Sequence, residues 1–112
     1  MLNVSIVLYN PDWKQVTTLT RALLECSHVR RIYWVDNSPT LQEPPVLSDK
    51  VRYIFNNQNL GYGAAHNIAI RESIYDDIPF HLVVNPDIVV APDAITTLLQ
   101  VIQQHQELGL IA

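Results

Sequence analysis

The tripeptide Asn85-Pro86-Asp87 interrupts the apolar run of residues 80–90, and it carries the clearest chemical signal in the chain. A proline inside such a run removes a ladder hydrogen bond, so a strand should end or bend there. Asp87 is then a carboxylate at a strand end with apolar neighbours, and it needs a cation, a hydrogen-bond network or a metal ion. We expect Asp87 to hold a divalent metal ion against a phosphate. For this tripeptide alone, a solvated aspartate in a turn is the alternative.

Three further groups of polar side chains follow apolar runs in the same way. They are Tyr9-Asn10-Pro11-Asp12, Asp36-Asn37-Ser38, and residues 56–59 followed by Gly61 and Gly63. Each group alone is typical of the turn after any strand. Together with Asn85-Pro86-Asp87 they supply amides and two carboxylates directly at strand ends, Asp36 and Asp87. Such a set suits a nucleoside or polyol with a metal-bound diphosphate.

The segment Gly61-Tyr62-Gly63 precedes a predicted helix, where glycines let the backbone approach a phosphate or a sugar closely. It is not the dinucleotide-binding fingerprint, because His66 stands where the third glycine belongs, and the chain has no Gly-Lys-Ser/Thr of a phosphate-binding loop. A tight turn with close helix–sheet packing is the alternative for these glycines. His66 is either a ligand or a structural hydrogen-bond partner, and the second interpretation is favoured.

The elements that must position these residues alternate between buried strands and amphipathic helices. Strands are predicted over residues 4–9, 32–35, 51–55 and 80–84, with another beginning at residue 110. Helices are predicted from an N-cap at Asp12 to about Glu25, from about Ala64 to Tyr75, and from about Asp93 to a C-cap at Gly109. Their apolar faces are Val16, Leu19, Leu23 and Leu24; Ala65, Ile68, Ala69 and Glu72; and Ile95, Leu98, Leu99 and Ile102.

This order predicts an α/β fold with a mostly parallel sheet and helices on both faces. In such folds ligands bind beyond the carboxyl ends of the strands, where the strand order reverses. The polar groups at the strand ends should therefore meet at one edge of the sheet.

Composition sets further limits on the class of protein. The 112 residues predict one domain, and 48% hydrophobic with 16% charged residues is an ordinary globular composition. A net charge of −4 argues against nucleic acid as the main partner. The single cysteine, Cys26, excludes an internal disulfide, which fits a reducing cytosol. The apolar run of residues 4–8 is too short for a signal peptide or a membrane span.

The four polar groups, in this order and at these spacings, resemble the family 2 glycosyltransferases. The matching segments are residues 4–10, 35–38, 57–67 and 84–87, so the likeness covers nearly the whole chain. The resemblance implies the GT-A fold, a Rossmann-like three-layer α/β/α sandwich that binds a nucleoside-diphosphate sugar. The segments around Tyr9 and Asn85 are most similar to rhamnosyltransferase-type members, which build cell-surface polysaccharides.

By position, the resemblance implies that Asp36 hydrogen-bonds a pyrimidine base while Tyr9 and Asn10 line the nucleoside pocket. It also assigns three residues to the loop and helix near the base and the diphosphate, namely Asn59, Gly61 and Asn67.

Asn85 stands at the first position of the family's Asp-x-Asp motif, so it can hydrogen-bond a ribose or a sugar but brings no charge. Asp87 remains as the ligand of Mg²⁺ or Mn²⁺, which one carboxylate, two phosphate oxygens and waters would suit. His66 stands where the family often has a basic residue, which implies a phosphate contact in its protonated form.

The implied reaction is inverting transfer of a sugar from a dTDP- or UDP-linked donor to a hydroxyl of a saccharide or lipid-linked acceptor. A metal would neutralise the leaving diphosphate, and a carboxylate base would take the acceptor proton. In the family that base lies downstream, so Asp87 is not the base. We expect residues 1–112 to be a single donor-binding domain, truncated before the acceptor half and without a catalytic base. Residues 110–112 should lack a sheet partner or pair in a homo-oligomer.

A non-catalytic nucleotide-binding or assembly module is the alternative function. A nucleotidyltransferase would need a glycine-rich, cationic loop after the first strand, and residues 10–14 do not provide one. The expected location is the cytoplasm, either free or at the inner face of the membrane.

Overall fold

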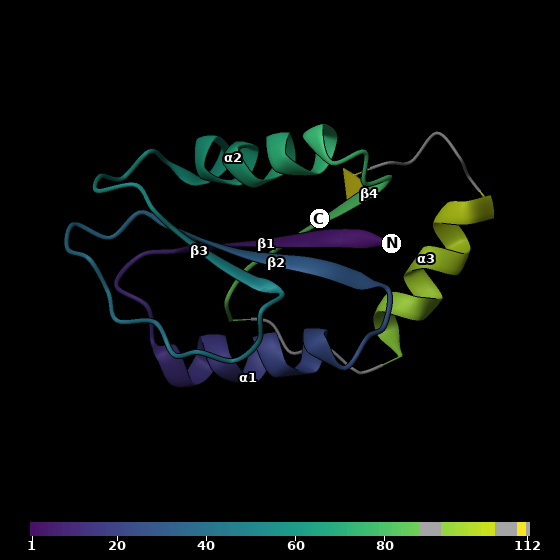
Figure 1. Cartoon of the computed structure of the whole chain (residues 1–112), viewed down its shortest axis with the longest axis horizontal. Coiled ribbons are helices and arrows are strands. Elements are labelled where there is room, and N and C mark those ends of the chain that lie inside the picture. The colour runs from purple at the N-terminus through teal and green to yellow at the C-terminus, as the bar shows by residue number, and fades with distance from the viewer. Residues whose placement is uncertain (88–92, 105–109, 112) are drawn as a thin grey trace.

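The chain is organised around a parallel sheet, drawn in Figure 1. The computed structural model describes residues 1–87, 93–104 and 110–111. The strands in these ranges are β1 (Leu2–Leu8), β2 (Val29–Asp36), β3 (Val51–Phe55), β4 (Phe80–Val84) and β5 (Leu110–Ile111). The helices are α1 (Trp13–Leu24), α2 (Tyr62–Tyr75) and α3 (Ala94–Gln104). The strand order is β3-β2-β1-β4-β5. β2 and β3 lie on one side of β1, whereas β4 and β5 lie on the other, so the strand order reverses between β1 and β4.

Helices cover both faces of the sheet, with α1 and α2 on opposite sides in Figure 1. Alternate residues of a strand point to opposite faces, and the even-numbered residues of β1 face the α1 side. The main core there contains Leu2, Val4, Ile6 and Leu8 with Val16, Leu19 and Leu23 of α1 and Ile95 and Leu99 of α3. On the other side Tyr33 and Val35 pack with Ala65 and Ala69 of α2. The predicted Rossmann-like three-layer α/β/α fold is therefore confirmed.

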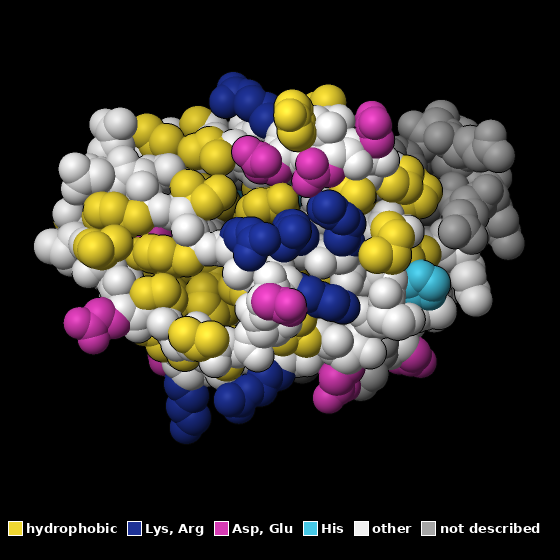
Figure 2. Space-filling model, viewed as in Figure 1, with side chains coloured by type: hydrophobic (Ala, Val, Ile, Leu, Met, Phe, Trp, Pro, Cys, Tyr) yellow, Lys and Arg dark blue, Asp and Glu magenta, His cyan; other side chains and the backbone are white. Residues whose placement is uncertain are grey.

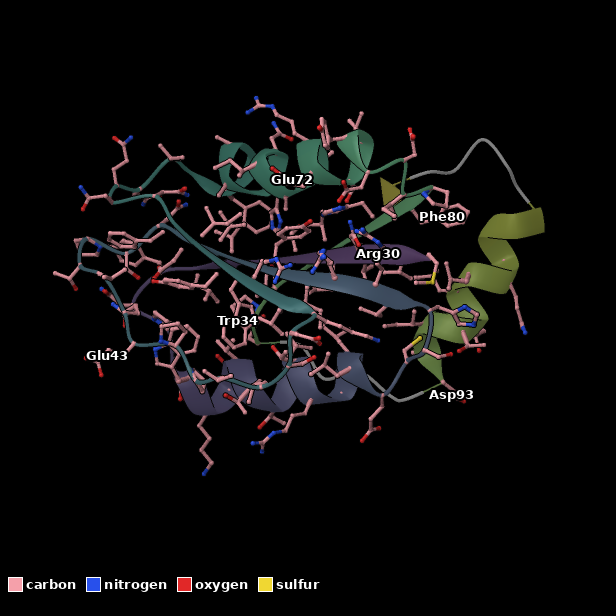
Figure 3. All side chains as sticks on the ribbon, in the orientation of Figure 1. Arg30, Trp34, Glu43, Glu72, Phe80 and Asp93 are labelled. Carbon is pink, nitrogen blue, oxygen red and sulfur yellow. The ribbon has the colours of Figure 1, made fainter. Side chains whose placement is uncertain are left out.

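A salt bridge also ties β2 to the end of α2. Arg30 lies in the middle of the face seen in Figure 3, and its Nη1 is 3.2 Å from Oδ2 of Asp76. Both side chains are about one-third exposed or less, so the pair contributes at most modestly to stability.

Most predicted elements are present, and the differences lie at their ends. β3 and β4 have the predicted bounds, and β4 ends before Asn85 as the proline predicts. β1 begins at Leu2 and ends at Leu8, so Tyr9 lies beyond the strand, and β2 is longer than residues 32–35. α2 begins at Tyr62 because Gly61, with φ of 84°, turns the chain directly into the helix. Residues 88–92, 105–109 and 112, with the predicted C-cap Gly109, lie outside the described residues.

The buried face of α2 includes Ala65 and Ala69, as predicted, but it also includes polar residues that were not predicted. Glu72 is exposed, and the buried residues are Ala65, His66, Ala69 and Ser73. Two polar residues can be buried on this face because they meet polar partners on the sheet, as described below. None of the helices in the described ranges has the length and apolar character needed to cross a bilayer.

The expectation that residues 110–112 lack a sheet partner in the chain is wrong for the two that are described. β5 pairs in parallel with β4, with Leu110 opposite His81 and Ile111 opposite Leu82. An oligomer is therefore not needed to pair this segment.

Asp12 caps α1 as predicted, and the cap makes a testable contribution to stability. Its backbone is extended, and its Oδ1 accepts a hydrogen bond from the Lys14 N–H at 3.1 Å. We expect Asp12→Ala to lower the free energy of unfolding by about 1 kcal/mol in urea denaturation. Asp49→Ala, in the exposed loop before β3, is the matched control. An equal loss in both variants would contradict a specific capping role.

Candidate functional site at the carboxyl ends of the strands

The sheet register brings the predicted polar groups to one edge. Leu8 of β1 lies opposite Asp36 of β2, and Asp36 lies opposite Phe55 of β3. On the other side of β1, Ile6 lies opposite Val84, the last residue of β4. Since all these strands run in parallel, the segments that follow them leave the sheet at the same edge. That edge includes the switch point between β1 and β4, where ligands bind in folds of this kind.

Hydrogen bonds join the segments after β1, β2 and β3 into one framework. The backbone N–H of Asn10, which has φ of 43°, donates to Ser38 Oγ at 2.7 Å. Asn37 is the centre of this framework: its Nδ2 donates to the Gly61 carbonyl at 3.2 Å, and its Oδ1 accepts from Asn56 Nδ2 at 2.8 Å. The sequence places Asn37 in the polar group after the second strand but indicates no contact for it. Its role depends on contacts between three separate segments.

Asn59 shapes the start of α2 from within the same loop. Its Oδ1 accepts the backbone N–H of Gly61 at 2.9 Å, and Gly61 has the left-handed φ that favours glycine. This local contact fits the predicted role of Asn59 and Gly61 in shaping the loop.

Asp36 is fully buried, and its partners come from the chain itself. Oδ1 accepts the backbone N–H of Ser38 at 2.9 Å, and Oδ2 accepts the hydroxyl of Tyr53. Burial, together with this hydrogen bond, raises the pKa of Tyr53 to about 12, so the phenol stays protonated and donates. The contact of Asp36 with a base stays a prediction, and it would require Tyr53 or the loop before β3 to move.

The remaining predicted site residues are exposed at or near this edge. The Tyr9 side chain is 57% exposed, and Asn10, Asn59, Asn67 and Asp87 are also exposed. Asn85 is exposed too, and its Oδ1 accepts the hydroxyl of Tyr62 at 2.8 Å. These side chains are accessible to a ligand, whereas Asp36 is not.

Asp87 is available for metal binding, but its carboxylate is exposed and does not need a cation to compensate for burial. Water can solvate its exposed carboxylate, so the argument that a desolvated strand end needs a cation does not hold. Among the described residues, no group of three or more His, Cys, Asp or Glu side chains could hold an ion. A metal bound by Asp87 would therefore need most of its ligands from phosphate and water. Mg²⁺ commonly binds in this way, with one or two carboxylates and substrate phosphates, so the residues present fit such an ion.

Two surface hollows lie beside the loop before β3. One, of about 500 Å³, lies between α1 and that loop and is lined by residues that include Trp13, Lys14 and Glu43. The other, of about 160 Å³, is lined by residues that include Trp34, Leu47 and Tyr53. The Tyr53 side chain thus lines the smaller hollow, and its hydroxyl donates to the buried carboxylate of Asp36.

A buried polar seam beneath α2 was not predicted. It consists of Asn3 and Ser5 of β1, His81 of β4, and His66 and Ser73 of α2, all less than 5% exposed. The Ser5 hydroxyl lies 2.7 Å from His66 Nδ1 and 2.8 Å from His81 Nε2. Ser73 Oγ lies 2.7 Å from His81 Nδ1 and accepts from Asn3 Nδ2 at 2.9 Å. The seam connects α2 to both strands at the switch point.

The two histidines of the seam are neutral at pH 7. Burial lowers the pKa of His66 from 6.5 to about 4, and burial and the neighbouring His66 lower the pKa of His81 to about 4. The expected phosphate contact of a protonated His66 is therefore corrected: His66 is a structural core residue whose Nδ1 is bound to Ser5. His81, which sequence spacing gave no role, belongs to the same network.

The fold defines a class, the α/β domains with a parallel sheet, in which ligands generally bind beyond the carboxyl ends of the strands, where the polar edge of this chain lies. The sequence model of Glycosyl transferase family 2 matches residues 4–112, and the chain belongs to this family. The chain is thus a glycosyltransferase domain. A search of curated proteins found no match. The rhamnosyltransferase-like subtype stays a prediction.

The buried histidines predict a loss of stability in acid. The unfolded chain takes up protons near pH 6.5, whereas the folded chain does so only near pH 4. Stability should therefore be complete above pH 6.5 and should fall by roughly 2 kcal/mol per histidine as the pH decreases toward 4.5. Urea denaturation at several pH values in this range measures the slope of the free energy of unfolding against pH. His81→Asn should reduce the slope, whereas the exposed control His28→Gln should leave it unchanged; equal slopes in wild type and His81→Asn would contradict the seam's role.

The hydroxyl of Tyr53 is predicted to stabilise the buried Asp36 carboxylate. Tyr53→Phe leaves Oδ2 of Asp36 without this partner, and we expect a loss of about 1–3 kcal/mol in the free energy of unfolding. Ultraviolet titration of the phenols should also lose the group that ionises near pH 12. Tyr75→Phe, at a tyrosine that is 86% exposed, is the control. If Tyr53→Phe is as stable as wild type and still contains a phenol that ionises near pH 12, the proposed role of the Tyr53 hydroxyl is wrong.

Proposed function

We propose that this chain binds a nucleoside-diphosphate sugar at the edge formed by the ends of β1 to β4, as the donor-binding part of an inverting glycosyltransferase. The observation that carries the proposal is the register, which aligns the ends of β1 to β4 at one edge. Asp36 ends β2 there, and hydrogen bonds tie the segments that contain Asn10, Gly61 and Asn85 to that edge or to the first turn of α2. The reversal of strand order lies at this edge, and the chain belongs to a glycosyltransferase family.

In this proposal different residues bind the nucleoside and the diphosphate of the donor. Tyr9 and Asn10 line the nucleoside pocket, and Asp36 accepts a hydrogen bond from a pyrimidine base once Tyr53 has moved. Asn59, Gly61 and Asn67 shape the loop and first turns of α2 near the diphosphate. The preferred donors are then UDP- or dTDP-linked sugars, as in the synthesis of cell-surface polysaccharides on saccharide or lipid-linked acceptors.

Charge supports a metal ion in this arrangement. Asp87 would repel a diphosphate directly, because both carry negative charge. A divalent cation between them turns this repulsion into attraction, so Asp87 is proposed to hold Mg²⁺ or Mn²⁺ against the phosphate oxygens. When bound, such an ion stabilises the charge that develops on a leaving diphosphate.

Isothermal titration calorimetry with UDP and dTDP, with Mn²⁺ or with EDTA, tests this proposal. We expect binding in Mn²⁺ and a loss of roughly tenfold or more in affinity, about 1.4 kcal/mol, in Asp87→Asn. Asp77→Asn is the matched control, because Asp77 is exposed at the other end of α2 and its positive φ tolerates asparagine.

Three outcomes separate the parts of the proposal. Binding that is equal in EDTA, or equal in Asp87→Asn, would remove the metal role of Asp87. GDP binding as tight as UDP binding would contradict a pyrimidine pocket. A folded chain that binds none of these nucleotides would overturn the donor-binding function.

A further inference from the structure

The Tyr62 side chain connects the first turn of α2 to the residue that follows β4. Its hydroxyl donates to Asn85 Oδ1 at 2.8 Å across 23 positions of sequence. Its ring packs edge-on against the His66 ring, with centroids 4.4 Å apart and an interplanar angle of 75°. His66 is itself fixed by the Ser5 hydroxyl at 2.7 Å. Tyr62 is therefore held at its ring and at its hydroxyl, although the side chain is 53% exposed.

This contact determines which end of the Asn85 amide faces a ligand. A primary amide has one oxygen that accepts hydrogen bonds and one nitrogen that donates two. The Asn85 oxygen is used by Tyr62, and Asn85 is exposed. Since one lone pair of this oxygen is engaged by Tyr62, the two Nδ2 donors are the groups that the amide offers most readily to a ligand. An unrestrained amide could rotate and present either end.

We propose that Tyr62 is a positioning residue that orients Asn85 so that its Nδ2 donates to an oxygen of the bound donor's diphosphate. The inference rests on the proposed function and deepens it. Asn85 and Asp87, separated by one residue, then have different tasks: the amide donates to substrate oxygens, and the carboxylate faces the cation.

The orientation also depends on the buried seam. Ser5 fixes His66, the His66 ring supports the Tyr62 ring, and the Tyr62 hydroxyl fixes Asn85. The interior of the domain is thereby linked to its ligand edge through packed side chains only.

A double-mutant cycle with Tyr62→Phe and Asn85→Ala tests the inference in the whole chain. Tyr62→Phe keeps the ring on His66 and removes only the hydroxyl. We expect UDP binding in Mn²⁺ to weaken by roughly fivefold in Tyr62→Phe, the effect of one hydrogen bond. Since Tyr62 acts through Asn85, the double variant should bind no more weakly than Asn85→Ala alone. Tyr75→Phe, on the last turn of the same helix, should bind as wild type does.

A spectroscopic readout tests the contact without any ligand. The side-chain amide signals of Asn85, identified in ¹⁵N-correlated spectra by their loss in Asn85→Ala, should shift in Tyr62→Phe and not in Tyr75→Phe. Unchanged amide signals, wild-type affinity in Tyr62→Phe, or additive losses in the double variant would overturn the positioning role. If the wild-type chain binds no nucleotide but the Asn85 amide signals do shift in Tyr62→Phe, the contact is supported and it is the proposed function that fails.

Discussion

The Ser5 hydroxyl, shared by two histidine rings, is the interaction on which the ligand edge depends. It joins the central strand to α2 and β4 at once, and burial keeps both rings neutral at pH 7 by lowering the pKa of each to about 4. One proton order uses each donor once: Asn3 donates to Ser73, Ser73 to His81, His81 to Ser5, and Ser5 to His66. His66 Nε2 then carries a proton, and this atom has no hydrogen-bond partner among the described residues. A neutral, ordered network of this kind fixes the position of α2 more specifically than apolar contacts alone would.

Signals that are local in the sequence were sufficient to predict most of the fold. The Asp12 cap, the apolar stripe of α1 and the β-branched runs of β3 and β4 each depend on neighbouring residues, and the structure contains them. On α2, Ala65 and Ala69 are buried as predicted, but the burial of His66 and Ser73 was missed because their partners are polar and distant. His66 is 61 positions from Ser5, and Ser73 is 70 positions from Asn3. The alternation of polar residues at positions 3 and 5 within an apolar strand was the available signal, and it indicates a polar inner face.

The candidate site was predictable in outline and not in its contacts. Parallel strands place their following segments at one edge whatever the side chains are, so the convergence of these segments followed from the order of elements. The pairing of Asp36 with Tyr53 and the central position of Asn37 arise from loop conformations that no periodicity encodes. Asp87 is exposed although apolar residues flank it in the sequence, because a turn after β4 frees its side chain from the layers of the core.

The position of β3 at the border of the sheet has a consequence for behaviour at high concentration. An edge strand such as β3 offers unpaired backbone N–H and C=O groups to other chains, and such strands can promote aggregation. Arg52 is exposed on β3, and Lys50 immediately precedes the strand. Figure 2 shows cationic side chains gathered over the middle of this face, where β2 and β3 lie. Two like-charged copies would repel each other on approach along this border, which favours the dispersed protein in crowded solution.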